Sequence, residues 1–389
     1  MKTLIHGGDV VAYAAGGHRL LRNGVLVFEN DRVTFVGRTF AGPVDRRIDA
    51  TGKLVIPGFV NIHCHADTEA GGRLIADVGR RDYFHTGFLN YYGARKGAKS
   101  LGPRQDPEIG GRFAMAEMLR NGCTTVVDIG VAAESHARIA GELGLRAYLS
   151  PAYKSAEYVV DGSGRLSYEE NEAEGMAGLE RAKQFIRKRA GDYDGRLQGM
   201  LFPYQVDTCS PALLRATRKA ADELGVGIEI HAGQNLLEFH EILRRHTMTP
   251  VEYLADTGLL GPDAIVGHCI ISTAHHLAGL PAGRDLEILA QTGASVATAR
   301  SSSPGAATRW SRSRSTGGPA STWGSAPTPI RAISSARCAG RRISARSSSA
   351  TSPSPPPRTS SRRSRSAVPA RSAATTSAGW RRGRRRTSC

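Results

Sequence analysis

Seven short apolar runs alternate with stretches of helical character between residues 57 and 297, and this repeat restricts the fold more than any other feature. The helical stretches include Ile109–Arg120, Pro211–Leu224 and Leu286–Gln291. Gly144 and Gly293 stand just ahead of two runs, where glycine ends a helix before a strand begins. Repeated strand–helix units build a parallel sheet, and seven strands exceed what a minimal doubly wound domain needs. The repeat predicts an α/β fold, a TIM-type (β/α)8 barrel truncated after about strand seven. The predicted strands are Phe59–Ile62, Thr124–Ile129, Arg146–Leu149, Gly199–Phe202, Gly227–Ile230, Ala264–Val266 and Ala294–Val296.

The first 56 residues have a different pattern, which is typical of a small β unit. Val25–Phe28 and Arg32–Val36 are rich in β-branched and aromatic residues, and Asn30-Asp31 between them has turn chemistry. We expect a small β unit over 1–56 and an incomplete barrel over 57–297. The chain start lacks the layout of a signal peptide, and the six cysteines are scattered singly, so we expect a reduced, cytoplasmic setting.

Composition changes abruptly at residue 298. The last 92 residues contain 19 Arg, no Lys and no acidic side chain, which leaves 33 basic and 35 acidic side chains, a net charge of −2, in the first 297. The overall charge of +17 therefore belongs to the tail, and a uniformly basic nucleic-acid-binding protein is excluded. A membrane protein is excluded because no run of about 18 apolar residues occurs. We expect residues 298–389 to be a disordered Arg/Ser-rich tail, because such a composition buries little apolar surface.

Two explanations of the tail remain open. It is a natural Arg/Ser-rich segment, or the reading frame has slipped near codon 298. In the neighbouring frame, the codons of 297–299 permit His-Cys and those of 325–328 permit Gly-Thr-Asp, in the order and spacing of the missing eighth unit. Resequencing the locus distinguishes the two explanations.

Histidines end three of the predicted strands. His63 and His65 follow the run at Phe59–Ile62, and they project to one face because alternate strand residues share a face, while the residue between them points into packing. His231 and His268 end the later runs in the same way. A lone histidine at such a place is more often a core residue than a ligand, but three successive strand-end cases at one barrel rim indicate a metal site.

Neutral imidazoles bind a borderline divalent ion such as zinc or iron and leave positions open for water. The ion lowers the pKa of that water toward about 7, which makes hydroxide available at neutral pH. A carboxylate should complete the site as ligand and general base, yet no Asp follows residue 285.

Several motifs in combination resemble the amidohydrolase superfamily, in the branch of cytosine deaminase-like and triazine hydrolase (chlorohydrolase) enzymes. The matching segments are 57–65 (PGFVNIHCH), 122–128 (GCTTVVD), 231–232 (HA), 250–268 (PVEYLADTGLLGPDAIVGH) and 293–297 (GASVA). The resemblance implies a small N-terminal β-sandwich half over 1–56 and a metal-dependent hydrolase barrel, incomplete here, over 57–297. It also implies that His63, His65 and His231 bind one divalent metal ion, Zn or Fe, and that His268 polarises the substrate or the water.

Two departures from the family pattern follow. The strand-eight Asp that the family uses as ligand and base is absent, and Gln234 stands where ring deaminases of this branch carry a proton-shuttling Glu. An amide binds substrate but does not relay protons near neutral pH, so Gln234 is a predicted substrate-binding residue. The fourth strand carries no Lys, which favours a mononuclear site.

The sequence thus predicts a metal-dependent amidohydrolase that uses a metal-bound hydroxide to hydrolyse a non-peptide C–N bond of a small nitrogen-rich or heterocyclic substrate. Loss of the strand-eight Asp is expected to impair this chain. The partner is a small molecule, with no membrane or nucleic acid, and a homo-oligomer is left open. The alternatives are a catalytically dead remnant and a nucleic-acid-binding protein that acts through its basic tail.

Overall fold

The computed structural model describes residues 1–14, 17–67, 106–130, 132–160, 166–273, 275, 278–281, 283–298 and 332–334. Residues 1–340 form one compact unit and residues 341–389 a second, which lies wholly outside the described residues. Among the residues described, no helix has the length and apolar character needed to cross a bilayer.

The N-terminal region forms a five-stranded sheet in the order β3-β2-β1-β4, with β5 also paired to β1. β1 and β2 are antiparallel, as are β2 and β3, whereas β4 and β5 run parallel to β1. The predicted turn between β2 and β3 is present, and Asn30 adopts the left-handed conformation there with φ 53°. The sheet therefore confirms the small N-terminal β unit. The strands are β1 (Lys2–Ala14), β2 (Gly17–Glu29), β3 (Arg32–Gly37), β4 (Arg46–Asp49) and β5 (Leu54–Val55).

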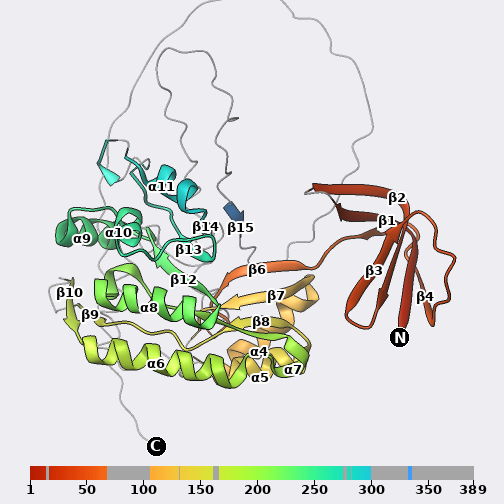
Figure 1. The fold of residues 1–389 in the computed structure, drawn as a ribbon, viewed down its shortest axis with the longest axis horizontal. Helices are drawn as coiled ribbons and strands as arrows, with labels where there is room; N and C mark the ends of the chain where they lie inside the picture. The colour runs from red at the N-terminus through yellow and green to blue at the C-terminus, as the bar shows by residue number, and fades with distance from the viewer. Residues whose placement is uncertain are drawn as a thin grey trace, which may run out of the picture. The chain divides into compact units, whose positions relative to one another are not determined.

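The second sheet has eight strands in the order β15-β14-β13-β12-β11-β8-β7-β6, all parallel to their neighbours. Figure 1 shows these strands in succession with helices packed along the sheet. Within the part of the chain that is described, β6 and β15 are the two edges, so the barrel is nearly closed but incomplete, as the sequence predicts. The strands are β6 (Phe59–Cys64), β7 (Cys123–Asp128), β8 (Arg146–Leu149), β11 (Leu197–Leu201), β12 (Gly227–Ala232), β13 (Ala264–His268), β14 (Ser295–Thr298) and β15 (Ala332–Ser334).

All seven predicted barrel strands are present, with ends displaced by at most two residues. Three strands described after β8 were not predicted, β9, β10 and β15. β9 (Ala156–Val160) and β10 (Leu166–Glu170) form an antiparallel hairpin after β8. β15 lies in the segment that was expected to be disordered throughout, so that expectation is wrong for residues 332–334, which pair with β14. The rest of the tail lies outside the described residues.

Helices begin and end where the sequence has capping residues. α8 starts with a side-chain cap, because the Ser210 hydroxyl accepts a hydrogen bond from the N–H of Leu213 at 3.0 Å and Pro211 occupies the first turn. α5 and α11 end on Gly144 and Gly293 with φ of 81° and 72°, a backbone conformation that suits glycine. The helices are α4 (Pro107–Arg120), α5 (Ala133–Leu143), α6 (Glu172–Arg189), α7 (Asp192–Gly195), the 3-10 turn η1 (Val206–Thr208), α8 (Pro211–Leu224), α9 (Leu236–His246), α10 (Pro250–Asp256) and α11 (Asp285–Thr292).

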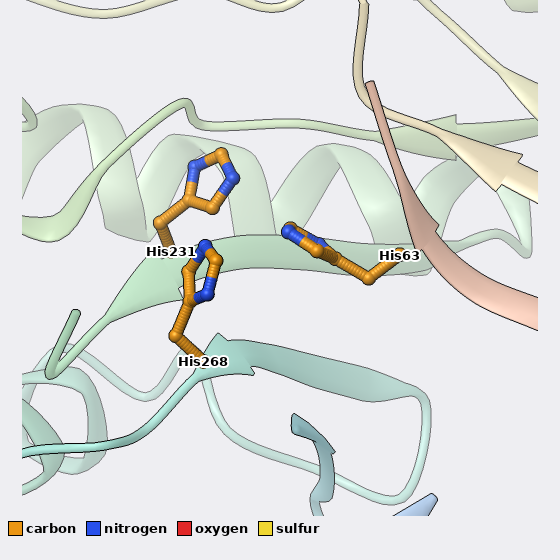
Figure 2. A group of neighbouring side chains, drawn as sticks. All are labelled: His63, His231 and His268. Atoms are coloured by element: carbon orange, nitrogen blue, oxygen red, sulfur yellow. The ribbon is translucent and has the colours of Figure 1, made fainter. Parts of the chain in front are cut away.

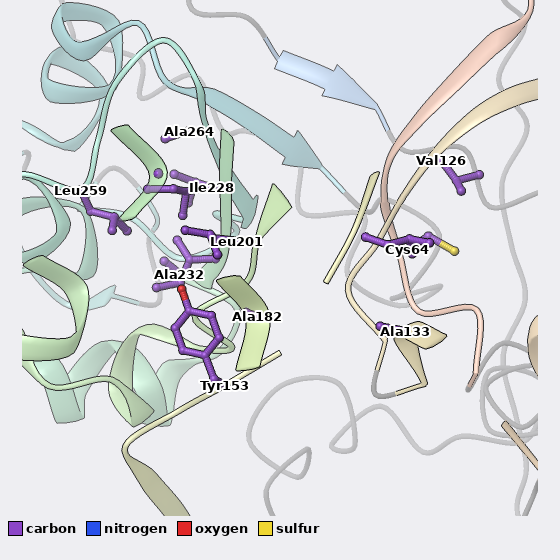
Figure 3. Packing of buried hydrophobic residues seen from close by; sticks show 14 of the residues in the cluster. Cys64, Val126, Ala133, Tyr153, Ala182, Leu201, Ile228, Ala232, Leu259 and Ala264 are labelled. Carbon is purple, nitrogen blue, oxygen red and sulfur yellow. The ribbon is translucent and has the colours of Figure 1, made fainter. Parts of the chain in front are cut away.

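The main hydrophobic core lies between the parallel strands and the helices. It combines strand residues such as Leu201 and Ile228 with helix residues such as Ala182, all of them buried (Figure 3). Met200 and Phe202 belong instead to a second, smaller cluster with residues of other strands. Strand residues therefore pack into hydrophobic clusters on both faces of the sheet. This packing fixes the direction of the side chains at the carboxyl ends of the strands.

Candidate metal centre

The first strand of the barrel presents His63 to the site and Cys64 to the core. His63 is buried, and the Cys64 thiol lies 4.0 Å from the Met118 sulfur on α4. Figure 3 shows Cys64 beside Val126 and Ala133 in the core. The predicted alternation along β6 is confirmed, since successive strand residues point to opposite faces.

His231 occupies the corresponding place on β12. Its Nδ1–H donates to the backbone carbonyl of Tyr204 at 2.5 Å, so a metal would bind its Nε2. The Nε2 of His65 lies 3.0 Å from the Nε2 of His231, and the two rings are stacked with their centroids 5.0 Å apart. The structure thus brings together two residues that are 166 positions apart in the sequence.

His268 ends β13 in a strained backbone conformation. His268 and Cys269 have φ of 71° and 45°, a left-handed conformation that non-glycine residues rarely adopt and that is concentrated at functional sites. Hydrogen bonds fix the strained segment, because the N–H of Cys269 donates to the carbonyl of Ala232 at 3.0 Å and that of Ile271 donates to Gly233 at 2.7 Å. These backbone hydrogen bonds to the end of β12 therefore hold the segment that positions the His268 imidazole.

Three of the histidines form a compact set of ligands. His63, His231 and His268 each offer a ring nitrogen, and these atoms all lie within 4.8 Å of one another. Figure 2 shows the three rings directed toward one another from β6, β12 and β13. The centroids of the His63 and His65 rings are 5.2 Å apart, so all four predicted histidines belong to one cluster.

Two features of this cluster fit a divalent ion. Two nitrogens bound to one tetrahedral zinc ion at about 2.0–2.1 Å lie about 3.3 Å apart, close to the 3.0 Å between His65 and His231. Gly267 lies opposite His231 in the β12–β13 register, and a Cβ added there would lie 3.1 Å from His63 Cε1 and 3.3 Å from His231 Cδ2. A bare Cα is therefore what allows the two rings to approach, and the predicted divalent-metal cofactor is supported.

The electrostatics of the cluster favour neutral imidazoles. Burial lowers the pKa of His231 well below its usual range, and the charges of His63, His65 and His268 lower it further. Burial and the charge of His63 lower the pKa of His65 to about 4. Neutral imidazoles are the form that binds a metal, so His65 and His231 are ready to act as ligands at neutral pH.

The predicted substrate-binding residue, Gln234, lies in the loop after β12. Its backbone N–H donates to Glu238 Oε2 at 2.9 Å, and the N–H of Gly233 donates to Glu238 Oε1 at 2.5 Å. Gln205 Nε2 also donates to Glu238, at 3.0 Å. Burial and the charge of Asp207 raise the pKa of Glu238 to about 8, although these hydrogen bonds oppose the shift. Glu238 therefore holds the loop that carries Gln234, and the substrate role of the Gln234 amide stays a prediction.

Two buried carboxylate–imidazole pairs were not predicted. Glu229 Oε1 lies 2.5 Å from His63 Nδ1, and Asp128 Oδ2 lies 2.6 Å from His136 Nδ1. The signal for Glu229 was its place two residues before His231, on the same face of an otherwise apolar strand. No comparable local pattern joins Asp128 at the end of β7 to His136 on α5.

The Asp128–His136 pair supports the loop that follows β6. Asp128 Oδ1 accepts a hydrogen bond from the N–H of Ala66 at 2.9 Å, one residue beyond His65. His136 Nε2 lies 3.1 Å from the carbonyl of Pro107, so both ring nitrogens have oxygen partners. Burial lowers the pKa of His136, but its hydrogen bond to Asp128 and the charge of Asp128 outweigh burial and raise the pKa to about 8. This pair acts as a protonated structural link.

Comparison with known proteins identifies the family. The model of the amidohydrolase family matches residues 54–322. A 5-methylthioadenosine/S-adenosylhomocysteine deaminase of Symbiobacterium thermophilum is 29% identical over 300 residues, which are 76% of this chain and 62% of the relative. The chain thus spans less than two thirds of the length of that relative.

Solved structures share the fold. An adenosine deaminase from Xanthomonas campestris with bound zinc has a TM-score of 0.57 at 21% sequence identity. The match covers 76% of this chain and 62% of the deaminase chain. An atrazine chlorohydrolase from Arthrobacter aurescens complexed with zinc has a TM-score of 0.57 at 19% sequence identity. That match covers 76% of this chain and 65% of the chlorohydrolase chain. The predicted resemblance is confirmed, and the chain belongs to the amidohydrolase family.

Proposed function

We propose that this chain is a metal-dependent amidohydrolase that hydrolyses a C–N bond, other than a peptide bond, in a small nitrogen-rich or heterocyclic molecule. The observation that carries the proposal is the cluster of His63, His65, His231 and His268 at the carboxyl ends of parallel strands, where barrel enzymes carry their active sites. His63, His65 and His231 would hold one zinc or iron ion. When bound, such an ion supplies a water with a pKa near 7 as the nucleophile.

His268 is the proposed catalytic residue. Its ring centroid lies 4.7 Å from that of His63 and 5.3 Å from that of His231, beside the proposed ligands. A neutral imidazole there donates a hydrogen bond to the substrate atom that gains negative charge, or accepts a proton from the attacking water. A ring nitrogen of His268 also lies within 4.8 Å of those of His63 and His231, and from there His268 would bind the metal as a fourth ligand if it does not polarise the substrate or the water.

The proposed substrate class depends on Gln234 and on the relatives. An amide presents one acceptor and two donors, which matches the ring nitrogens and amino groups of a nitrogen heterocycle. The relatives' names describe deaminases of adenine-containing molecules and a chlorohydrolase of a triazine, which supports the same class for this chain. Gln234 cannot shuttle a proton near neutral pH, so C–N and C–Cl hydrolysis are both included in the test.

Impaired activity is part of the proposal. The last acidic residue of the sequence is Glu287, so neither β14 nor β15 brings a carboxylate to the rim. A slipped frame near codon 298 accounts for this absence. A clean read through codon 298 with no missing base would remove the slipped frame from the proposal.

The activity experiment compares two proteins, the chain as written and a chain with the frame restored at codon 298. Each is loaded with zinc or iron and given an adenine nucleoside, a pyrimidine, a chlorotriazine and a simple amide, with release of ammonia or chloride as the readout. We expect metal-dependent hydrolysis by the restored chain, its loss in His231→Ala, and little activity in the chain as written. Gln234→Glu in the restored chain should raise ring deamination, because it adds a group able to shuttle protons.

Three results would contradict parts of this proposal. Turnover by the chain as written at an ordinary enzymatic rate, on the order of 10 per second, would refute impairment. No hydrolysis of any compound by the metal-loaded restored chain would refute the activity. Tail-dependent nucleic-acid binding with a steep salt dependence, unchanged in His231→Ala, would favour a different function.

The proposed function also implies a binding partner and a cellular setting for this chain. A small molecule is the proposed partner. Among the described residues, Cys123, Cys209 and Cys269 are free and buried, which supports the predicted reducing, cytoplasmic setting.

A further inference from the structure

Glu229 is a charged residue in the middle of an apolar strand inside the barrel. It lies on β12 two residues before His231, and its side chain is fully buried. A buried carboxyl group is costly unless a partner compensates for the water it has lost. A buried glutamate in an apolar strand therefore requires a specific hydrogen-bonding partner.

That partner is His63. Glu229 Oε1 lies 2.5 Å from His63 Nδ1, and the two side chains are 0% and 4% exposed. A neutral imidazole carries its proton on one nitrogen only, and an acceptor at Nδ1 favours the tautomer with the proton there. That tautomer directs the lone pair of Nε2 away from Glu229.

We propose that Glu229 is a positioning residue that accepts a hydrogen bond from His63 Nδ1–H and fixes the ring with Nε2 toward the metal. This inference rests on the proposed metal site. Carboxylates that hold ligand histidines in this way orient the ring and raise its basicity, and their loss costs about 10–100-fold in metal affinity or activity.

The other ligands make the assignment more specific. His231 Nδ1 donates to the backbone carbonyl of Tyr204, and His65 hydrogen-bonds the backbone of Ile129. The partner of His63 is a side chain, so a substitution at Glu229 can release the orientation of this ring. Glu229 contacts His63 through Nδ1, which leaves Nε2 of the same ring for the metal.

The experiment measures zinc affinity by competition with a chelator in the full chain, for the wild type, Glu229→Gln and Glu229→Leu. Leu removes the acceptor and should weaken binding by about 10–100-fold, whereas Gln retains an acceptor oxygen and should preserve most of the affinity. Asp285→Asn is the matched control. Asp285 is also buried, but it binds Thr249 at 2.6 Å and the N–H of Thr273 at 2.8 Å, away from the cluster. That variant should lose stability and retain zinc affinity.

Nitrogen-15 NMR of the histidine rings in the wild type gives a second readout, which does not require the Leu variant to fold. We expect His63 to carry its proton on Nδ1 in the zinc-free and the zinc-bound protein. A proton on Nε2, or zinc binding by Glu229→Leu as tight as by the wild type, would overturn the positioning role while the metal site stands. If the wild type binds zinc no better than His231→Ala, the proposed metal site itself is wrong and the inference is overturned with it.

Discussion

Two buried carboxylate–imidazole pairs lie in this barrel, and they have nearly the same geometry. The oxygen–nitrogen distance is 2.5 Å in Glu229–His63 and 2.6 Å in Asp128–His136, and all four side chains are at most 4% exposed. The pairs differ in what the second ring nitrogen meets. His136 turns its Nε2 to the carbonyl of Pro107, whereas His63 belongs to the histidine cluster.

The surroundings of each pair therefore determine its role. Two oxygen partners favour a protonated ring, which suits His136 as a structural link between β7, α4 and the loop after β6. The His63 ring instead lies among three other imidazoles, those of His65, His231 and His268, which suits it as a metal ligand. A distance between a carboxylate and a histidine does not distinguish a structural pair from a metal-site pair, but the atom facing the other nitrogen does.

The largest expected effect is on the structural pair. Asp128→Asn keeps the shape of the side chain but cannot accept hydrogen bonds from both His136 and Ala66. Removing one partner of a buried pair costs about 3–5 kcal/mol, so the free energy of unfolding in urea should fall by that amount.

The control for this experiment is Asp222→Asn. Asp222 pairs with Arg218 at 2.5 Å on the surface, where ion pairs contribute little, so stability should hardly change. If Asp128→Asn is as stable as this control, the pair is not the structural link described above.

A smaller effect concerns pH. The pKa of His136 is raised from 6.5 to about 8 on folding, so the folded state binds the proton more tightly than the unfolded state. The resulting stability is fully present below pH 6.5 and is lost as pH rises through about 8, a decrease on the order of 2 kcal/mol.

The difference between the wild type and His136→Gln isolates this contribution, because all other titrating groups are shared. Urea unfolding of both proteins from pH 6 to pH 9 should show the difference shrinking as pH rises. A difference that is constant over this range would mean that His136 is neutral in the folded protein.

The smallest expected effect is steric and concerns the space between the His63 and His231 rings. Gly267→Ala places a methyl group 3.1 Å from His63 Cε1 and 3.3 Å from His231 Cδ2, tighter than ordinary contact. Displacing the rings should weaken zinc binding about tenfold, or about 1.4 kcal/mol, within the usual cost of overpacking. Gly17→Ala, where an added Cβ meets nothing within 4 Å, is the control. Equal zinc affinity in both variants would show that the rings need no such space.

Local sequence patterns were sufficient to predict the barrel strands and the candidate ligands. The period-2 alternation at 63–65 and the strand ends at His231 and His268 are set by residues adjacent in sequence, and the Ser210 cap is equally local. Parallel pairing then brings the strand ends together, because carboxyl ends share one rim. Fold class and the histidine cluster could therefore be predicted without coordinates.

Features that depend on distant residues could not be predicted. The β9–β10 hairpin is fixed by Tyr158 and Tyr168, whose hydroxyls donate to Asp207 at 2.8 Å and 2.7 Å. Glu229 meets a histidine 166 positions away. Side-chain direction and partner choice are set by tertiary packing, which periodicity does not encode.

The histidine cluster as a metal site is the central claim, and metal content tests it most directly. The full chain is equilibrated with zinc, freed of excess ion and analysed for zinc per protein, beside His231→Ala treated identically. We predict one zinc ion per wild-type chain and a large loss in His231→Ala, with both proteins folded by circular dichroism. No bound zinc in the wild type, or equal zinc in the two proteins, would contradict the account.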